Sequence, residues 1–142
     1  MLVMKLPLLL ILLVTYCVTG WTQQSTAVKG RLVCGTEPAT NVTVRLMDND
    51  RGIDRNDKMD STYTDENGEF SLSGDETELT TIDPELIIYH QCNKGINPCP
   101  RRWKFGIPDK YIFAGDEPRK VFDIGTLNLE VEIERESFDC LF

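Results

Sequence analysis

Apolar and polar residues alternate along much of this chain with the two-residue period of a β-strand. The clearest example follows Val121, where Leu127, Leu129, Val131 and Ile133 alternate with polar and acidic residues. A helix would scatter these side chains around its circumference, whereas a strand places them on one face. The pattern therefore predicts a strand with a buried apolar face and a solvated acidic face.

Several shorter segments show the same alternation and are separated by turn residues. An Asn-Gly pair at 67–68 predicts one tight turn, because glycine adopts positive φ at little cost. We expect residues 21–27 to be a loose lead-in and residues 74–81 to be a loop. The other predicted strands are 28–34, 41–46, 61–64, 69–73, 86–91 and 102–105, with 111–113 as a strand or loop edge.

The stretch from Ile82 to Phe105 organises the rest of the chain. An apolar run rich in β-branched and aromatic residues, 86–91, is followed by a loop between Cys92 and Cys99 and then by a second alternating segment. These features predict two strands joined by a loop. With the other segments, and with no convincing amphipathic helix, they predict an all-β protein that folds as an antiparallel β-sandwich.

Five aspartates and three basic residues crowd the segment from Asp48 to Asp60, whose sizeable apolar residues are Ile53 and Met59. Such a segment buries little surface, so we expect an exposed loop. A calcium site is the alternative, but the spacing lacks the glycine at the sixth loop position and the glutamate at the twelfth that an EF-hand requires. The three interspersed cations also favour the solvated loop.

The first twenty residues have the pattern of a secretory signal peptide. Lys5 gives a positive start, residues 8–14 are an unbroken apolar run, and suitable residues precede a cleavage site before Trp21. An uncleaved membrane anchor is the alternative, but the apolar run is too short to span a bilayer. We therefore expect a signal peptide at 1–20, a secreted, extracellular domain at 21–142, and no transmembrane segment.

The chain carries 15 basic and 23 acidic residues, a formal net charge of −8. Without the signal peptide and its Lys5, 14 basic residues face 23 acidic ones, and the net charge becomes −9. A protein this acidic would be repelled by the phosphates of nucleic acid. The balance favours solubility and leaves the sign of any local surface patch open.

Four cysteines remain once Cys17 leaves with the signal peptide: Cys34, Cys92, Cys99 and Cys140. An even number in an exported domain predicts two disulfides, for which three pairings are possible. We favour Cys92–Cys99, because these residues close one short loop. The second bond would then be Cys34–Cys140, which would tie the first strand to the C-terminal tail.

His90 is the only histidine, so a hydrolytic triad would need it as the base. No Gly-x-Ser-x-Gly motif or other marked nucleophile accompanies it. His90 falls on the same strand face as Leu86 and Ile88, which predicts a buried, hydrogen-bonded structural histidine. A metal site with Cys92 and Cys99 is disfavoured, because zinc clusters usually show tighter paired spacing. We expect no catalytic residue, no metal and no cofactor.

Arg101, Arg102, Trp103 and Lys104 form the basic cluster of the sequence. We consider them a candidate binding edge for an anionic lipid headgroup or an acidic extracellular protein. The alternative is that these cations neutralise the acidic residues of a neighbouring strand, such as those at 130–134.

Asn41-Val42-Thr43 is an N-glycosylation sequon. In a secreted protein this sequon predicts a glycan on Asn41, provided that the asparagine is exposed.

Seven short motifs follow one another along the mature chain. They are Gly-Arg-Leu-Val-Cys (30–34) with Pro38, Val-Arg-Leu-Met-Asp (44–48), Thr-Asp-Glu-Asn-Gly-Glu-Phe (64–70), Ile-Asp-Pro-Glu-Leu-Ile-Ile-Tyr-His-Gln-Cys (82–92), Ile-Pro-Asp-Lys-Tyr (107–111), Asp-Ile-Gly-Thr-Leu-Asn-Leu (123–129) and the terminal Asp-Cys (139–140). Any one of these motifs is weak, but together they are specific. In them the chain resembles the transthyretin-like family of secreted nematode proteins.

The resemblance implies a transthyretin-like sandwich of seven or eight strands, secretion, and disulfides among the matching cysteines. The role that the resemblance suggests is extracellular recognition, including contact with cell surfaces, although fold likeness alone does not carry function. The alternative function is a carrier of a small hydrophobic ligand or hormone. A hydroxyisourate hydrolase is less favoured, because that enzyme uses several histidines and a C-terminal Tyr-Arg-Gly-Ser. This chain has one histidine and ends in Asp-Cys-Leu-Phe.

Overall fold

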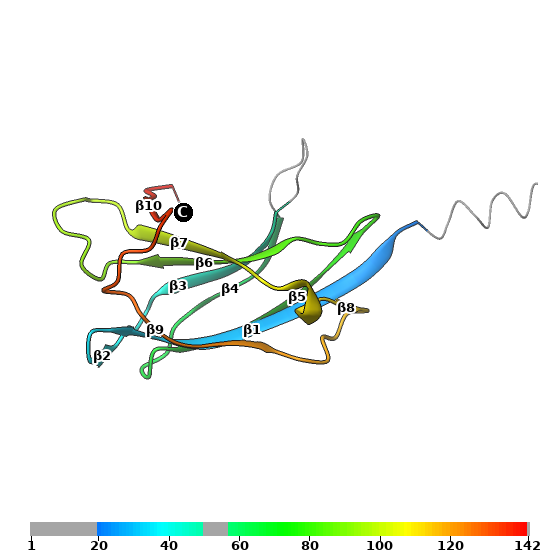
Figure 1. Cartoon of the computed structure of the whole chain (residues 1–142), viewed down its shortest axis with the longest axis horizontal. Helices are drawn as coiled ribbons and strands as arrows, with labels where there is room; N and C mark the ends of the chain where they lie inside the picture. Colours follow the sequence, from blue (N-terminus) through cyan, green and yellow to red (C-terminus); the bar gives the residue numbers. More distant parts are fainter. Residues whose placement is uncertain (1–19, 50–56, 142) are drawn as a thin grey trace, which may run out of the picture.

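The structure, a computed structural model, describes residues 20–49 and 57–141. Within these ranges two β-sheets pack against each other, accompanied by one short 3-10 helix (Figure 1). Seven strands have six residues or more, which confirms the predicted sandwich of seven or eight strands. In chain order the elements are β1 (Thr22–Cys34), β2 (Glu37–Pro38), β3 (Thr43–Asp48), β4 (Asp57–Tyr63), β5 (Glu69–Glu78), β6 (Pro84–His90), β7 (Arg101–Gly106), η1 (Asp109–Tyr111), β8 (Phe113–Ala114), β9 (Phe122–Asn128) and β10 (Ser137–Phe138).

The predicted signal peptide at 1–20 lies, except for Gly20, outside the described residues. In the two ranges that the structure describes, no helix is long and apolar enough to cross a bilayer.

β1 is the centre of the first sheet. It pairs antiparallel with β5 over most of its length, and with the two-residue strands β2 and β8 near its ends. It also pairs with β9, and this pair is parallel, whereas the other strand pairs of the described residues are antiparallel, as the predicted antiparallel sandwich requires. The route of the chain explains the exception. β8 pairs with the beginning of β1, the chain then reverses, and β9 runs along β1 in the same direction (Figure 1).

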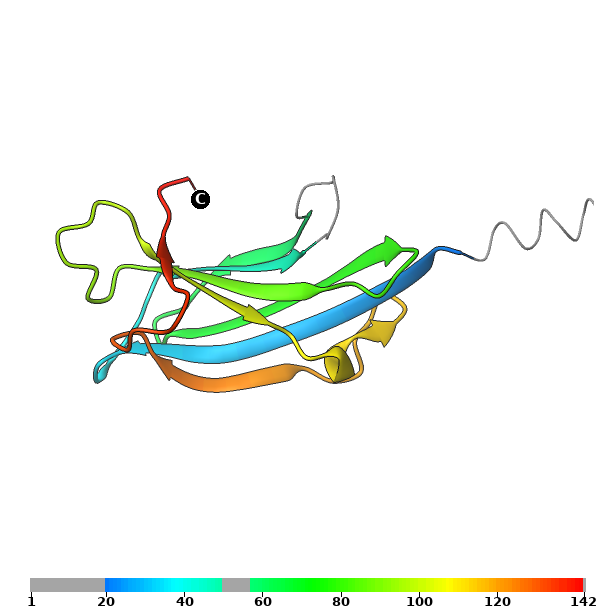
Figure 2. The same cartoon turned by 45° about the horizontal axis from the view of Figure 1, so that its top comes forward.

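β6 is the centre of the second sheet, whose strand order is β10-β7-β6-β3-β4. Its pairings are all antiparallel, and all seven residues of β6 are buried. The antiparallel pair of β6 and β7 confirms the two strands predicted within 82–105. Figure 2 shows this sheet stacked over the long strands β1 and β5 of the first sheet.

The core lies between the sheets and comes from the inward-facing positions of each strand. Leu32 of β1, Val44 and Leu46 of β3, and Ile88 of β6 are completely buried, and Leu72 of β5 is nearly so. Removing a side chain of this size from water stabilises a fold by about 1.5–3 kcal/mol. The alternation in each strand is what brings these residues to one side of their sheet.

The predicted lead-in at 21–27 and the loop from residue 74 are wrong, because β1 and β5 extend into these segments and pair with each other. Gln24 is buried there although it is polar. Its side chain donates to the Thr80 carbonyl at 2.7 Å and accepts from the Ile82 N–H at 3.1 Å. Hydropathy misses such a strand, because its buried polar groups are satisfied by hydrogen bonds to distant residues.

The predicted C-terminal strand is correct only as far as Asn128, where β9 ends. Leu129 is fully buried, but Val131 is 54% exposed. The chain turns here because the Asn128 side-chain oxygen accepts the N–H groups of Gly35 and Glu130, and its carbonyl accepts the Val131 N–H. Asparagine readily makes such local hydrogen bonds to the backbone, and they override the alternating pattern.

The exposed loop expected at 48–60 is shorter than predicted. Asp48 ends β3, is 1% exposed, and accepts the Asp83 N–H at 2.8 Å. β4 begins at Asp57, and Met59 packs against the core from this strand. The middle of the expected loop, residues 50–56, lies outside the described residues.

The predicted Asn-Gly turn forms, with Gly68 at a φ of 76°. The Asp65 carboxylate shapes it by accepting the N–H groups of Asn67 and Glu69. A Cβ atom on Gly68 would lie 2.2 Å from the Leu32 carbonyl oxygen in the central strand β1. The turn therefore needs glycine both for its backbone conformation and for its close approach to β1.

We expect Gly68→Ala to destabilise the protein more than Gly95→Ala does. Both glycines have positive φ, but a Cβ on Gly95 would have nothing within 4 Å. The conformation alone costs an alanine about 1 kcal/mol, and overpacking against Leu32 should raise the loss at Gly68 to about 3 kcal/mol. Urea unfolding measures the free energy of unfolding of both variants. Equal losses would show that the close approach of Gly68 to the Leu32 carbonyl does not add to the cost.

Candidate functional site

The four cysteines form two disulfides, but not in the pairing favoured from the sequence. The bonds are Cys34–Cys92, with Cα atoms 5.8 Å apart, and Cys99–Cys140, with Cα atoms 4.7 Å apart. The short-loop argument for Cys92–Cys99 fails because these residues pack on different neighbours. Cys92 lies in the core at the end of β6, opposite the end of β1, whereas Cys99 precedes β7 and lies beside the C-terminal tail.

The disulfides also bear on the alternative metal site. The sulfur atoms of Cys92 and Cys99 are each bonded to another sulfur, so neither is a thiolate that could ligate zinc beside His90. Within residues 20–49 and 57–141, no cluster of His, Cys, Asp or Glu side chains is arranged to hold a metal ion.

Arg101, which we predicted as part of a binding edge, is instead buried, with 2% of its surface exposed. Its Nη1 donates to the carbonyls of Cys92 and Leu129 at 2.9 and 2.8 Å. Its Nη2 donates to the Val131 carbonyl at 2.7 Å and to Glu136 at 2.6 Å, and its Nε donates to the other Glu136 oxygen at 3.2 Å. These five hydrogen bonds match the five N–H donors of a guanidinium.

Trp103 joins this buried cluster and is likewise unavailable to a partner. It is 2% exposed, and its indole N–H donates to Glu136 at 2.9 Å. The pKa of Glu136 lies below its ordinary value, mainly because Arg101 donates hydrogen bonds to the carboxylate. Glu136 is therefore ionised at neutral pH. Arg101 and Trp103 therefore anchor the segment around Glu136 to the sandwich, which corrects their assignment to a binding edge.

His90 is buried, as predicted, and its ring lies edge-on to Trp103 with centroids 5.2 Å apart. Its Nδ1 accepts the Cys92 N–H at 3.2 Å, so Nδ1 carries no proton. Burial, and next the nearby charge of Arg101, lowers the pKa of His90 to about 4. The imidazole is therefore neutral at pH 7 and has a structural role at the end of β6.

The other two members of the predicted edge face outward. Arg102 and Lys104 alternate with the buried residues of β7, so they lie on the outer face of the second sheet. Arg102 Nε lies 3.8 Å from Asp139, and Lys104 Nζ lies 3.0 Å from Glu85. Their acidic neighbours thus come from β6 and the tail after β10, and not from the acidic residues 130–134.

Two further cations share this outer face. The strand register places Arg45 of β3 in one row with Ile87 of β6 and Lys104 of β7. Lys58 of β4 lies in the row next to Arg45. We call these four residues the basic face: Arg45, Lys58, Arg102 and Lys104.

Sequence reasoning missed half of the basic face. The alternation in 41–46 placed Arg45 on the polar side of its strand, but only the sheet brings it into one row with Lys104, across Ile87. Lys58 was expected in a loop and instead lies on β4. Among the described residues of this face, four cations stand against the carboxylates of Glu85 and Asp139, in a chain whose net charge is −8. The face is therefore positive on a negative protein.

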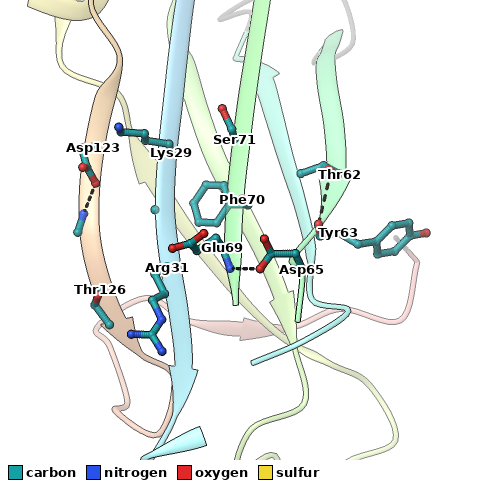
Figure 3. Close-up of a pocket in the computed structure, with 12 residues that line it drawn as sticks. Lys29, Arg31, Thr62, Tyr63, Asp65, Glu69, Phe70, Ser71, Asp123 and Thr126 are labelled. Atoms are coloured by element: carbon teal, nitrogen blue, oxygen red, sulfur yellow. Dashed lines mark hydrogen bonds between the residues drawn. The ribbon is translucent and has the colours of Figure 1, made fainter. Parts of the chain in front are cut away.

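The outer face of the first sheet is different. A shallow hollow of about 610 Å³ lies over β1, β5 and β9, and its lining mixes Lys29 and Arg31 with acidic side chains (Figure 3). Asp123 accepts the Gly125 N–H, and Arg31 donates to the Asn67 carbonyl. These groups shape a bulge and a turn, and they give the hollow no dominant charge.

Asn41 is exposed in the turn before β3, with a φ of 55°. Its backbone N–H donates to the Thr64 carbonyl at 3.1 Å, which holds the main chain of the turn in place. Glycosylation of this residue remains a prediction, and the exposure that it requires is met.

The architecture and the surface together define a disulfide-bonded all-β sandwich with one basic outer face. Comparison with known proteins identifies its family. The profile of the transthyretin-like family matches residues 29–108. Transthyretin-like protein 5 of Caenorhabditis elegans is 48% identical over 139 residues, which cover 97% of this chain and 99% of that protein. The chain therefore belongs to the transthyretin-like family.

Other relatives agree. Transthyretin-like protein 33 of Caenorhabditis elegans is 47% identical over 83% of this chain and 82% of its own, and transthyretin-like protein 2 is 41% identical over 83% of each. A crystal structure of a 9R-lipoxygenase from Cyanothece is similar to 75% of this chain and 16% of that one, with 21% identity and a TM-score of 0.41. That likeness is too distant to indicate a function.

We expect Arg101→Met to destabilise the protein by about 3–5 kcal/mol, because it leaves three carbonyls without this donor and the Glu136 carboxylate without its charged partner, with Trp103 still donating to it. Arg102→Met, on the exposed side of the same strand, should cost at most about 1 kcal/mol. Urea unfolding of the two variants measures the difference. Similar losses would show that the buried hydrogen bonds do not hold the C-terminal segment.

The lowered pKa of His90 predicts a loss of stability in acid. The folded protein holds the proton on His90 less tightly than the unfolded chain does, so stability is full above the unfolded pKa of 6.5 and falls as the pH drops toward about 4. The shift corresponds to at most about 3.4 kcal/mol, and we expect roughly 2 after solvent screening.

His90→Gln is the control for this prediction, because it removes the titrating ring while keeping a polar side chain. The unfolding free energy of the variant should be nearly flat between pH 6.5 and 5, where the unmodified protein already loses stability. Parallel curves for the two proteins would assign the acid sensitivity to other groups.

Proposed function

We propose that this chain is a secreted, non-catalytic recognition module that binds an acidic extracellular partner through the basic face. The observation that carries the proposal is the gathering of Arg45, Lys58, Arg102 and Lys104 on one outer sheet face of a chain with net charge −8. Complementary charge of this kind selects partners and speeds their association.

Secretion is supported by the signal-peptide pattern of residues 1–20 and by the two disulfides, which persist mainly in oxidising compartments. A non-catalytic role is supported by the state of the reactive residue types. His90 is buried against Trp103, and the cysteine sulfurs of the described chain are bonded in pairs. Neither type can act as a base or nucleophile without opening the fold.

The residues that line the surface hollows give less support to the alternative function, a carrier of a small hydrophobic ligand. The hollow over β1, β5 and β9 is lined largely by charged and hydroxyl side chains, and a second hollow is bordered by Asp48, Glu78 and Asp109. Sites for apolar ligands are instead lined mainly by apolar and aromatic groups. The buried histidine likewise gives no support to hydroxyisourate hydrolysis.

A sulfonate cation-exchange matrix at pH 7 tests the basic face with a defined anionic surface. At about 0.1 M salt the screening length is about 10 Å, so the matrix should retain the mature protein through the nearby face despite its negative net charge. Retention should weaken at about 0.01 M salt, because a screening length of about 30 Å lets the whole charge of the protein repel the matrix.

Two double variants of equal charge make the test specific. Lys58→Gln with Arg102→Gln removes two cations of the basic face and should abolish retention. Lys29→Gln with Arg119→Gln removes one lysine and one arginine from exposed positions elsewhere and should elute like the unmodified protein. Equal elution of the two double variants would refute binding through the basic face.

A further inference from the structure

The cations of the basic face form a diagonal line over β7, β3 and β4 and do not surround one point. Arg45 and Lys104 lie in one row with β6 between them, which places their Cα atoms roughly 10 Å apart at normal strand spacing. Arg102 is two residues along β7 from Lys104, roughly 7 Å away, and Lys58 extends the line to β4. One small anion would reach only part of this line, so the spacing favours a ligand with repeated anionic groups.

The centre of the face exposes little apolar surface, which suits a sugar. The central apolar residues, Ile87 and Tyr89, are 4% and 8% exposed, so neither projects from the face. Tyr63, at the edge of the sheet, is 66% exposed and shares a row with Thr43 and Tyr89. Tyr63 also borders the hollow of the first sheet, and Figure 3 shows its ring projecting from β4 away from Lys29, Arg31 and Asp123 on the other side of that hollow. Such a ring offers an apolar surface to the C–H groups of a sugar and a hydroxyl for hydrogen bonding.

An anionic membrane matches this face less well. A lysine or arginine near an anionic bilayer contributes about 1 kcal/mol, and Glu85 and Asp139 offset part of that gain here. A bilayer is also wider than the face, so it would approach the acidic residues around it, such as Asp57. A narrow linear polyanion can follow the cations and avoid this repulsion.

From the line of cations and the exposed ring beside it, we infer that the acidic partner is a linear sulfated polysaccharide that crosses the strands of the basic face. This inference rests on the proposed function. The sulfate groups lie against Arg45, Lys58, Arg102 and Lys104, and a sugar ring packs on Tyr63. Arginine pairs well with such oxyanions, because its planar fork can donate two parallel hydrogen bonds.

Calorimetric titration of the mature protein with heparin oligosaccharides of defined length tests the inference. The logarithm of the affinity should fall with the logarithm of salt concentration with a slope of roughly −2 to −4, since three or four cations each release a counterion. Lys58→Gln with Arg102→Gln should lower the affinity at least about tenfold. The matched double variant Lys29→Gln with Arg119→Gln should stay within about twofold, and chemically desulfated heparin should not bind.

Tyr63→Ser separates this inference from the proposed function. The exposed ring is not part of the core, so the variant should fold normally and remain on the sulfonate matrix, which has no sugar. Its affinity for heparin should fall by about three- to tenfold, and Tyr63→Phe should restore most of the loss. Unchanged heparin affinity in Tyr63→Ser would overturn the contact between the ring and the sugar.

The remaining outcomes distinguish the other partners. Equal affinity for polyglutamate of matched charge, or tighter binding to vesicles containing anionic lipid, would overturn the polysaccharide and leave the proposed function standing. The polysaccharide would also be overturned, and the proposed function would stand, if the protein failed to bind heparin but was still retained by the sulfonate matrix. If the matrix failed to retain the unmodified protein, both the proposed function and the sulfated polysaccharide as its partner would be overturned.

Discussion

A guanidinium removed from water needs an acceptor for each of its five N–H donors, and this need shapes the C-terminal third of the protein. Arg101, at the start of β7, finds its acceptors in the carbonyls of Cys92, Leu129 and Val131 and in the carboxylate of Glu136. These groups belong to the loop after β6 and to the segment after β9, so one side chain ties both sheets together. A buried charge without such partners would cost several kcal/mol, so these hydrogen bonds hold the segment after β9 against β7 once Asn128 has turned the chain.

The same strand carries the recognition surface that we propose. Successive side chains of a strand point to opposite faces, so Arg101 and Trp103 enter the core while Arg102 and Lys104 face outward. Structural and surface roles therefore interleave within four consecutive residues. The disulfide Cys34–Cys92 and the Arg101 hydrogen bonds hold this end of the sandwich, which gives the cations of the basic face a rigid support.

The alternation of apolar and polar residues predicted strands correctly where one face of the strand is buried in the core. The alternation in 41–46, 86–91 and 102–105 found the strands of the second sheet, because each has one face in the core. It failed beyond Asn128, where side-chain and main-chain hydrogen bonds of one asparagine turn the chain despite a regular pattern. It also failed around Gln24, where buried polar groups make a strand look like a loop.

By itself, the sequence determined an all-β sandwich, a buried His90, the oxidation of four cysteines and membership of a family, because these follow from composition, period and motif. Tertiary structure alone decided which distant residues come together: Cys34 with Cys92, Arg101 with Glu136, and Arg45 in one row with Lys104. The physical reason is the order of the strands in each sheet. Residues tens of positions apart become neighbours when two strands pair, and the spacing of residues along the chain carries no record of that pairing.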